Sequence, residues 1–252
     1  MSVGARVRGL LGPRLERFAA NSYRRMFVDL DDVAATVAGL GRFHSVIEVG
    51  CGEGSMMSAL IARLDPDATA LGIDIADGPG RNYIGRSTNV QFRQADLAEI
   101  VAEGGRFDLV LISDVLHHVP PPARPAFLRS CGQLAAGGTI VLKEWVKRPN
   151  LAHAAAFSSD RYITGDKGVS FYTGDELKAL FTQVLHEEID DGDDSPGVIE
   201  RTARPHRRNN VMLAARLRLP TDPSHHVTED VDDDVGAAVG VEGVEPPAVA
   251  NP

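Results

Sequence analysis

The chain has 252 residues, of which 43% are hydrophobic and 24% charged, so its composition is that of a globular protein and not of a disordered one. Its net charge of −9 comes almost entirely from residues 221–252, which hold eight acids and no lysine or arginine and leave the rest of the chain at −1. A near-neutral body does not favour nucleic-acid binding, and no apolar stretch approaches the roughly 20 residues that span a bilayer.

The N-terminal segment combines arginines with a broken apolar stripe. Residues 1–28 contain six arginines and one acid, Glu16, and the helical spacing of the apolar residues is interrupted at Gly12-Pro13. Such a stripe could contact an anionic membrane surface weakly. The segment has no long apolar core and no clear cleavage site, which predicts a cytoplasmic protein. A helix is expected at 30–40, because the acids of 29–32 suit a helix N-terminus.

From residue 45 onwards, short apolar runs alternate with helical segments. Helices are predicted at 55–64, capped by Ser55, at 121–134, and from 173 to about 181. Strands are predicted at 45–49, 68–74, 89–94, 107–113, 138–145, 181–189 and 210–219. Strands that alternate with helices and are apolar on both faces indicate a doubly wound, mainly parallel seven-stranded α/β sheet, here with a final antiparallel strand pair.

This pattern divides the chain into three parts. Residues 1–42 form a helical extension, 43–220 form the α/β domain, and 221–252 form a disordered acidic tail, since they lose hydrophobic periodicity and gain Asp, Pro and Gly. Within the domain, residues 146–175 are predicted to be an insertion beside the substrate-binding side of the sheet.

The loop after the first strand carries the strongest functional signal. It begins at Glu48 and continues as Gly50-Cys51-Gly52-Glu53-Gly54, with a helix directly behind it. A dinucleotide loop normally has a different glycine spacing, and a Walker loop ends in Gly-Lys-Ser/Thr. The Glu48 carboxylate would repel a diphosphate but attract a cationic amino group. The loop resembles motif I of the class I, Rossmann-like S-adenosylmethionine-dependent methyltransferases, and this resemblance implies S-adenosylmethionine as the cofactor.

Later segments extend the resemblance over residues 45–145. An acid, Asp74, ends the second strand, Asp96-Leu97 follows the third, the fourth reads FDLVLISDVLHHV at 107–119, and a Gly-Gly turn precedes the fifth. The resemblance implies that Glu48 and the loop hold the amino-acid end of the cofactor, Asp74 the ribose and Asp96 the adenine. The implied cofactor-binding residues are Glu48, Gly50, Cys51, Gly52, Gly54, Asp74, Ile75, Asp96, Leu97, Ser113 and Asp114.

Candidates for the chemistry lie after the fourth and fifth strands. The resemblance places a histidine near the methyl donor, so His118 is the first choice for a general base and His117 the second, although both could be structural. Trp145 could wall an acceptor pocket or belong to the core. Between the fifth strand and the next helix, four further polar or aromatic residues could bind or deprotonate a hydroxyl: Asp160, Tyr162, Asp166 and Tyr172, with Asp166 the catalytic candidate.

The expected function is methyl transfer to a small-molecule acceptor, with the oxygen of a sugar or secondary-metabolite hydroxyl as the favoured atom. One alternative is C-methylation of a quinone- or lipid-like acceptor, and another is a non-catalytic cofactor-binding protein. Nucleic acid is not expected as a partner, because the fourth strand lacks the N/D-P-P-Y/F signature. A metal is not expected, because the adjacent His117 and His118 diverge and Asp114 lacks further ligands. The sequence does not indicate an oligomeric state.

Overall fold

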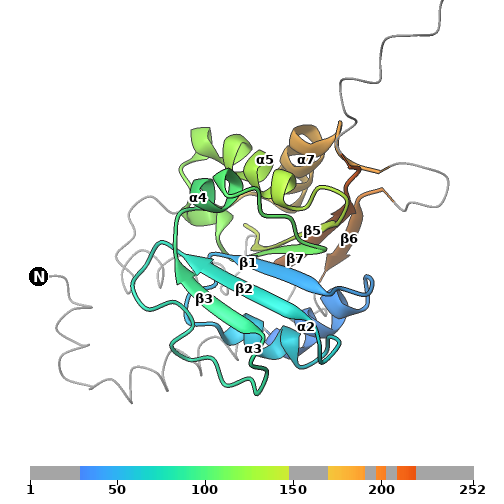
Figure 1. The fold of residues 1–252 in the computed structure, drawn as a ribbon. Coiled ribbons are helices and arrows are strands. Elements are labelled where there is room, and N and C mark those ends of the chain that lie inside the picture. Colours follow the sequence, from blue (N-terminus) through green and yellow to red (C-terminus); the bar gives the residue numbers. More distant parts are fainter. Residues whose placement is uncertain (1–28, 148–169, 191–196, 203–208, 220–252) are drawn as a thin grey trace, which may run out of the picture. The chain divides into compact units, whose positions relative to one another are not determined.

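This computed structural model describes residues 29–147, 170–190, 197–202 and 209–219. Seven strands form one sheet: β1 (Ser45–Val49), β2 (Thr69–Asp74), β3 (Val90–Gln94), β4 (Leu109–Ser113), β5 (Thr139–Trp145), β6 (Ile199–Thr202) and β7 (Asn210–Arg216). Their order is β3-β2-β1-β4-β5-β7-β6 (Figure 1). Neighbouring strands are parallel except at β7, which runs antiparallel to both β5 and β6. The predicted fold class is therefore confirmed.

The strand order reverses at the centre of the sheet. From β1 the chain moves outward to β2 and β3, and it then returns to place β4 on the other side of β1. The connections that follow β1 and β4 consequently lead to opposite faces of the sheet. In open α/β sheets this reversal is the place where a ligand-binding crevice forms.

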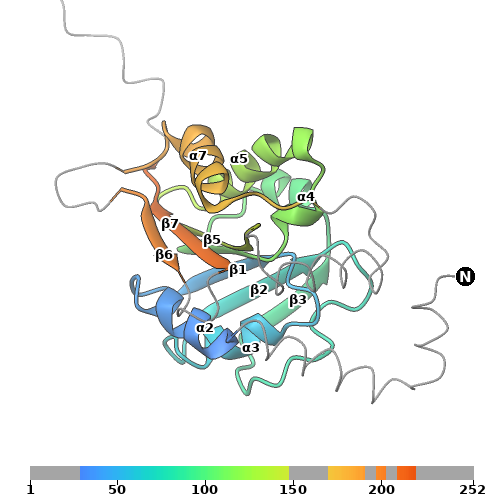
Figure 2. The same cartoon turned by 180° about the vertical axis from the view of Figure 1, so that it is seen from behind.

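Helices cover both faces of the sheet. On one face lie α2 (Leu30–Ala38) and α3 (Ser55–Ile61), and on the other lie α4 (Leu97–Ala102), α5 (Arg124–Leu134) and α7 (Gly174–Leu185) (Figures 1 and 2). The strands are apolar on both sides, as β4 illustrates: Leu109 and Leu111 pack with Met57 on the α2–α3 side, while Val110 and Ile112 face the other helices.

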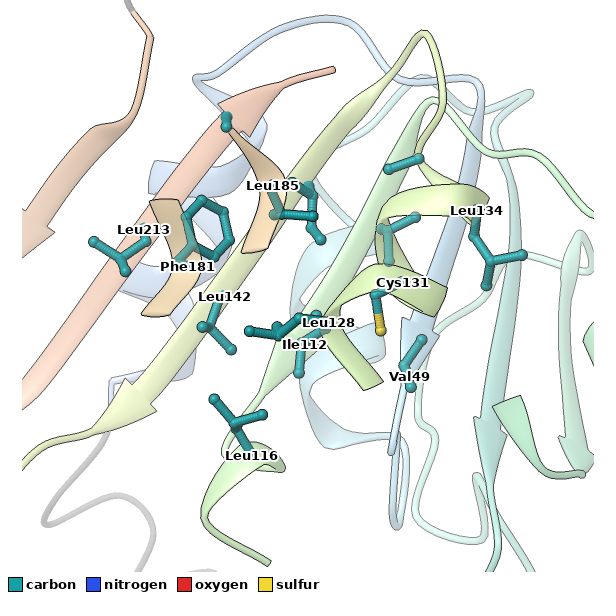
Figure 3. Close-up of a cluster of buried hydrophobic side chains, with 14 of the residues drawn as sticks. Val49, Ile112, Leu116, Leu128, Cys131, Leu134, Leu142, Phe181, Leu185 and Leu213 are labelled. Atoms are coloured by element: carbon teal, nitrogen blue, oxygen red, sulfur yellow. The ribbon is translucent and has the colours of Figure 1, made fainter. Parts of the chain in front are cut away.

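The core on the α5–α7 side contains side chains from elements distant in sequence. In Figure 3, Leu128 and Cys131 of α5 lie over Ile112 of β4, and Phe181 and Leu185 of α7 lie beside Leu213 of β7. All six of these apolar side chains are fully buried, which anchors both helices on the sheet.

The prediction of a strand at 181–189 is wrong. α7 continues to Leu185 because Leu177, Phe181 and Leu185, four residues apart, place one apolar face of a helix on the core. A capping box between Thr173 and Glu176 starts this helix. The sixth strand is β6 instead, for which the sequence pattern predicts no strand.

Two helix starts also differ from expectation. The N-cap of α3 is Gly54, with φ of 81°, and not Ser55, which is the first helical residue. α4 was not predicted; its N-cap is Asp96, whose carboxylate accepts the Ala98 N–H while the Glu99 side chain accepts the Asp96 N–H. A six-residue helix has too few apolar positions to produce a periodic signal.

Candidate active site

A cavity of about 750 Å³ lies at the carboxyl ends of β1, β2 and β4, where the strand order reverses. Many of the residues that line this cavity were predicted from the sequence to be site residues: Glu48, Gly50, Cys51, Gly52, Asp74, Ile75, Asp96, Leu97, Ser113, Asp114 and His118. Others were missed: Leu30, Val49, Ser55, Met56, Ile73, Ala95, Val115, Val119, Pro120 and Phe127. Most of the missed residues are apolar, so their sequence pattern does not distinguish a cavity wall from core.

The glycine loop turns tightly from β1 into α3. Its Gly50 and Cys51 N–H groups both donate to the Ile73 carbonyl, at 2.8 and 2.9 Å, which ties the loop to the end of β2. Gly50 has φ of 72°, and a Cβ there would lie 2.5 Å from Val115 Cγ2. Gly52 has φ of 50°, but a Cβ there would meet nothing within 4 Å. Gly50 is therefore required for packing, whereas Gly52 keeps space open at the cavity wall.

Glu48 is a buried acid with one unsatisfied oxygen. It is 2% exposed and lines the cavity, and its Oε2 atom has no hydrogen-bond partner. The pKa of this carboxyl is raised to about 8, mainly by burial; a hydrogen bond from the Met57 backbone N–H opposes the rise, and the nearby Asp74 charge adds to it. A buried carboxyl oxygen without a donor is costly, so this wall is suited to a ligand with a cationic or N–H group.

Asp74 connects β2 to the glycine loop. Its Oδ2 atom accepts the Gly52 N–H and its Oδ1 atom accepts the Ala76 N–H, both at 2.8 Å. Each carboxylate oxygen has a second lone pair, so both can still accept a ligand hydroxyl. Asp74 thus supports the loop and remains able to bind a diol.

The residues after β4 form the opposite wall. Asp114 has φ of 57°, a left-handed conformation uncommon outside glycine, and its carboxylate accepts from Lys143 Nζ at 2.5 Å. Lys143 is 1% exposed, so the charge of Asp114 is balanced from beneath the cavity. This partner was missed because it lies 29 residues away on the next strand.

The two adjacent histidines have different environments. His118 is exposed and lines the cavity. His117 is buried, with Nδ1 2.8 Å from Glu144 Oε2 and its ring stacked on Phe171 at 4.9 Å between centroids. Of the two predicted bases, only His118 is therefore positioned to reach a ligand in this cavity.

The acceptor-side candidates are only partly described. Asp160, Tyr162 and Asp166 lie outside the described residues. Trp145 is 8% exposed at the end of β5, and Tyr172 is half-buried beneath the Arg124 guanidinium, 4.6 Å from the ring centroid; neither lines the cavity. Within the described segments no group of three or more His, Cys, Asp or Glu could hold a metal ion. No helix in that part of the chain is long and apolar enough to cross a membrane.

The fold, with a cavity at its strand reversal, is Rossmann-like, and together with the family match given next it confirms the resemblance to class I methyltransferases. A family model described as a methyltransferase domain matches residues 5–184, and the chain belongs to this family.

Curated relatives match part of the chain. An enzyme named ubiquinone biosynthesis O-methyltransferase from Xanthomonas campestris pv. campestris is 32% identical over 155 residues, which cover 60% of this chain and 61% of that protein. A protein of the same name from Acinetobacter baumannii is 28% identical over 140 residues, or 53% and 55% of the two chains. The chain thus spans between half and two thirds of the length of these relatives.

Solved structures share the fold at low identity. An O-methyltransferase family protein from Burkholderia thailandensis has a TM-score of 0.58 at 18% identity and covers 75% of this chain and 56% of that one. An O-methyltransferase from neocarzinostatin biosynthesis, solved with S-adenosylmethionine and 2-hydroxy-5-methyl naphthoic acid, has a TM-score of 0.55 at 22% identity and covers 82% and 58%.

Proposed function

We propose that the protein is an S-adenosylmethionine-dependent methyltransferase that methylates an oxygen of a small-molecule acceptor. Family membership supports the class, and the unsatisfied Glu48 oxygen in the cavity wall is the observation that carries the cofactor assignment. A carboxyl oxygen that lacks a donor fits the ammonium of an amino acid, and it would oppose a diphosphate.

The residues of the cavity suit the three parts of this cofactor. Glu48 and the open face at Gly52 would hold the amino-acid end, Asp74 would accept the ribose hydroxyls, and the Asp96–Leu97 corner with Ile75 would contact the base. When bound, the cofactor supplies a methyl group already activated by the sulfonium. The protein therefore acts mainly by aligning the acceptor, which can contribute up to about 7–11 kcal/mol in favourable systems.

His118 is the proposed general base for a hydroxyl acceptor. Its ring is exposed and lines the cavity near Asp114, at the end of β4. A hydroxyl oxygen is a weak nucleophile until its proton is removed, and a neutral imidazole can accept that proton near neutral pH. His117 is less suited to this role because its Nδ1 atom is paired with Glu144. Asp166 stays a second candidate.

The acceptor is proposed to be a phenol or another secondary-metabolite hydroxyl, with a sugar hydroxyl as the polar variant. The names of the curated relatives and of the neocarzinostatin neighbour support an aromatic hydroxyl. The apolar side chains Val119, Pro120 and Phe127 on the cavity wall support a ring or chain acceptor as well. They equally favour the second candidate function, C-methylation of a quinone- or lipid-like molecule.

Binding and turnover measured separately test this proposal. S-adenosylhomocysteine binding by isothermal titration should be detectable for the wild type and strongly weakened by Glu48→Gln. Methyl transfer from labelled S-adenosylmethionine should appear with a panel of catechols, hydroxynaphthoates, prenylated quinols and sugars. His118→Asn should lower kcat on hydroxyl acceptors at least tenfold while leaving cofactor affinity within about threefold.

The outcomes separate the alternatives. Product analysis that finds a carbon–methyl bond would replace O-methylation by C-methylation. Cofactor binding without turnover across the panel would favour the non-catalytic alternative, and no binding of either cofactor form would refute the proposal.

We further propose cytoplasmic localisation, no nucleic-acid partner and weak contact of residues 1–28 with anionic membranes. Sedimentation with phosphatidylserine vesicles, with and without 1–28, tests the last of these.

A further inference from the structure

Two consecutive charged residues at the end of β5 are buried. Lys143 is 1% exposed and Glu144 is 3% exposed, and as neighbours in a strand they point to opposite faces of the sheet. No residue of β5 lines the described cavity. Buried charges are retained only where they have specific partners, so the groups that these two residues bind indicate their role.

Glu144 binds three consecutive residues of the loop that follows β4. Its Oε1 atom accepts the backbone N–H groups of Val115 and Leu116, at 2.8 and 2.6 Å, and its Oε2 atom lies 2.8 Å from His117 Nδ1. We assign Glu144 as the acceptor of this third contact too, as it is for both backbone N–H groups, with His117 Nδ1 as the donor. One side chain thus satisfies two backbone donors and fixes the orientation of one ring.

Lys143 binds the preceding residue of the same loop from the other face. Its Nζ atom contacts the Asp114 carboxylate, and its backbone carbonyl accepts the Asp114 N–H at 2.9 Å. Asp114 is held in a left-handed conformation, with φ of 57°. Every residue from Asp114 to His117 is therefore bonded to Lys143 or to Glu144.

The loop held in this way forms one wall of the cavity. Asp114, Val115 and His118 line it, and Val115 packs so closely on the glycine loop that a Cβ at Gly50 would lie 2.5 Å from its methyl group. We propose that Glu144 is a positioning residue that shapes this wall for cofactor binding and orients His118 through His117, without itself touching a ligand. This inference rests on the function proposed above.

The test combines amide exchange with cofactor affinity. In Glu144→Ala, the Val115 and Leu116 amides should exchange at least 100-fold faster than in the wild type, and the Kd for S-adenosylhomocysteine should rise at least tenfold, measured well below the melting temperature. A merely structural role would lower the melting temperature and leave the Kd of the folded protein unchanged. Glu200→Ala is the matched control, because it removes an exposed carboxylate, paired with Lys178, from the same sheet.

The isosteric variant Glu144→Gln separates the two halves of the interaction. Its side-chain carbonyl can still accept both loop amides, so their protection and the S-adenosylhomocysteine affinity should stay within about threefold of the wild type. Its NH₂ group would face His117 Nδ1, however, so nitrogen-15 spectra of the His117 ring should show the proton moving from Nδ1 to Nε2. An unchanged ring spectrum would contradict the assigned hydrogen bond.

The outcomes distinguish this inference from the function on which it rests. A wild type that does not bind S-adenosylhomocysteine refutes both. A wild type that binds, together with a Glu144→Ala variant of equal affinity, overturns the positioning role alone. If Glu144→Ala does not fold, Glu144→Asp replaces it: the carboxylate is retracted by one methylene, so affinity should still fall at least threefold, and wild-type affinity would overturn the proposal.

Discussion

Individual residues in the glycine loop have separate tasks, although they share one motif. Gly50 and Gly52 both have positive φ, but only at Gly50 does a neighbouring side chain occupy the place of a Cβ. Glu48 is buried with an oxygen left unsatisfied, whereas each Asp74 oxygen accepts one backbone N–H, from Gly52 or from Ala76, and can still accept a ligand hydroxyl. These differences lead to three predictions at the scale of the residue.

Gly52→Ala should lose cofactor affinity more than stability. A left-handed alanine costs about 1–2 kcal/mol, and its methyl group would extend into the open side of the loop. We expect the Kd for S-adenosylhomocysteine to rise at least tenfold. Gly104→Ala is the control, because Gly104 has φ of 74° with no atom near its Cβ position and does not line the cavity. Equal affinity loss in both variants would contradict the role of Gly52.

Glu48→Gln should change how stability depends on pH. The folded protein holds the Glu48 proton up to about pH 8, whereas an unfolded chain releases it near 4.5. Between these values the unfolded state binds fewer protons, so this group makes the free energy of unfolding fall as pH rises, by at most about 1.4 kcal/mol per unit. Urea unfolding at pH 5.5 and 8 measures this. The free energy of unfolding of Glu48→Gln, relative to that of the wild type, should be higher at pH 8 than at pH 5.5.

Cofactor affinity should respond to the same proton. Binding of an ammonium favours ionised Glu48, so binding releases the proton and the wild type should bind S-adenosylhomocysteine more tightly at pH 7.5 than at pH 6. Glu48→Gln should lose this dependence. Titration calorimetry in buffers of different ionisation enthalpy measures proton release directly. If the wild type released no proton on binding at pH 6.5, cofactor binding would not be coupled to the ionisation of Glu48.

At the scale of elements, the end of β5 determines the conformation of the connection that follows β4. The strands are paired in register up to Ser113 and Lys143, and the next residue, Asp114, departs from the sheet in a left-handed conformation. Hydrogen bonds from one strand terminus thus set the path of the neighbouring loop. Such a connection is absent from local sequence patterns because its two halves are 29 residues apart.

Asp114→Asn should destabilise the protein by about 1–3 kcal/mol. Asparagine tolerates the left-handed conformation, so the loss of stability reports mainly the buried Lys143 ammonium, which is left without a carboxylate. Because position 114 is partly exposed, water can solvate this ammonium and limits the loss. Urea unfolding measures the change. Adding Lys143→Met to Asp114→Asn should recover at least half of the loss, since it removes the uncompensated charge. A double variant less stable than Asp114→Asn would exclude this explanation.

At the scale of the whole molecule, the reversal of strand order assembles the site. β1 contributes Glu48, β2 contributes Asp74 and β4 contributes Ser113, and these residues are brought to one edge because the strands are parallel and adjacent. The predicted acceptor-side residues Asp160, Tyr162 and Asp166 lie outside the described segments. The predicted division at residue 220 can be tested independently of the chemistry.

Truncation after Pro220 should leave folding and cofactor binding unchanged. Residues 221–252 contain eight acids and little apolar periodicity, so the sequence predicts that they add no core. We expect a change in melting temperature below about 2 °C and an unchanged Kd for S-adenosylhomocysteine. A drop of 5 °C or more would show that these residues stabilise the α/β domain.

The strands β1 to β5 and the cofactor motif could be predicted because their signals are local. Strand β1 is an apolar run with Glu48 near its end and Gly50 directly after it; Asp74 ends a strand of the same kind, and Asp96 comes soon after another. The prediction at 181–189 failed because FTQVLHEEI reads as a short apolar run, while the fourfold spacing that makes it helical begins earlier, at Leu177.

By itself the sequence determined the fold class, the family resemblance and many of the residues that line the cavity, since backbone periodicity and glycine spacing act over a few neighbouring residues. Only the tertiary structure decided which histidine faces the cavity, which acid is unsatisfied and which residues hold the loop after β4. Those properties depend on burial and on partners from other strands: Glu144 turns His117 inward, and Lys143 balances Asp114.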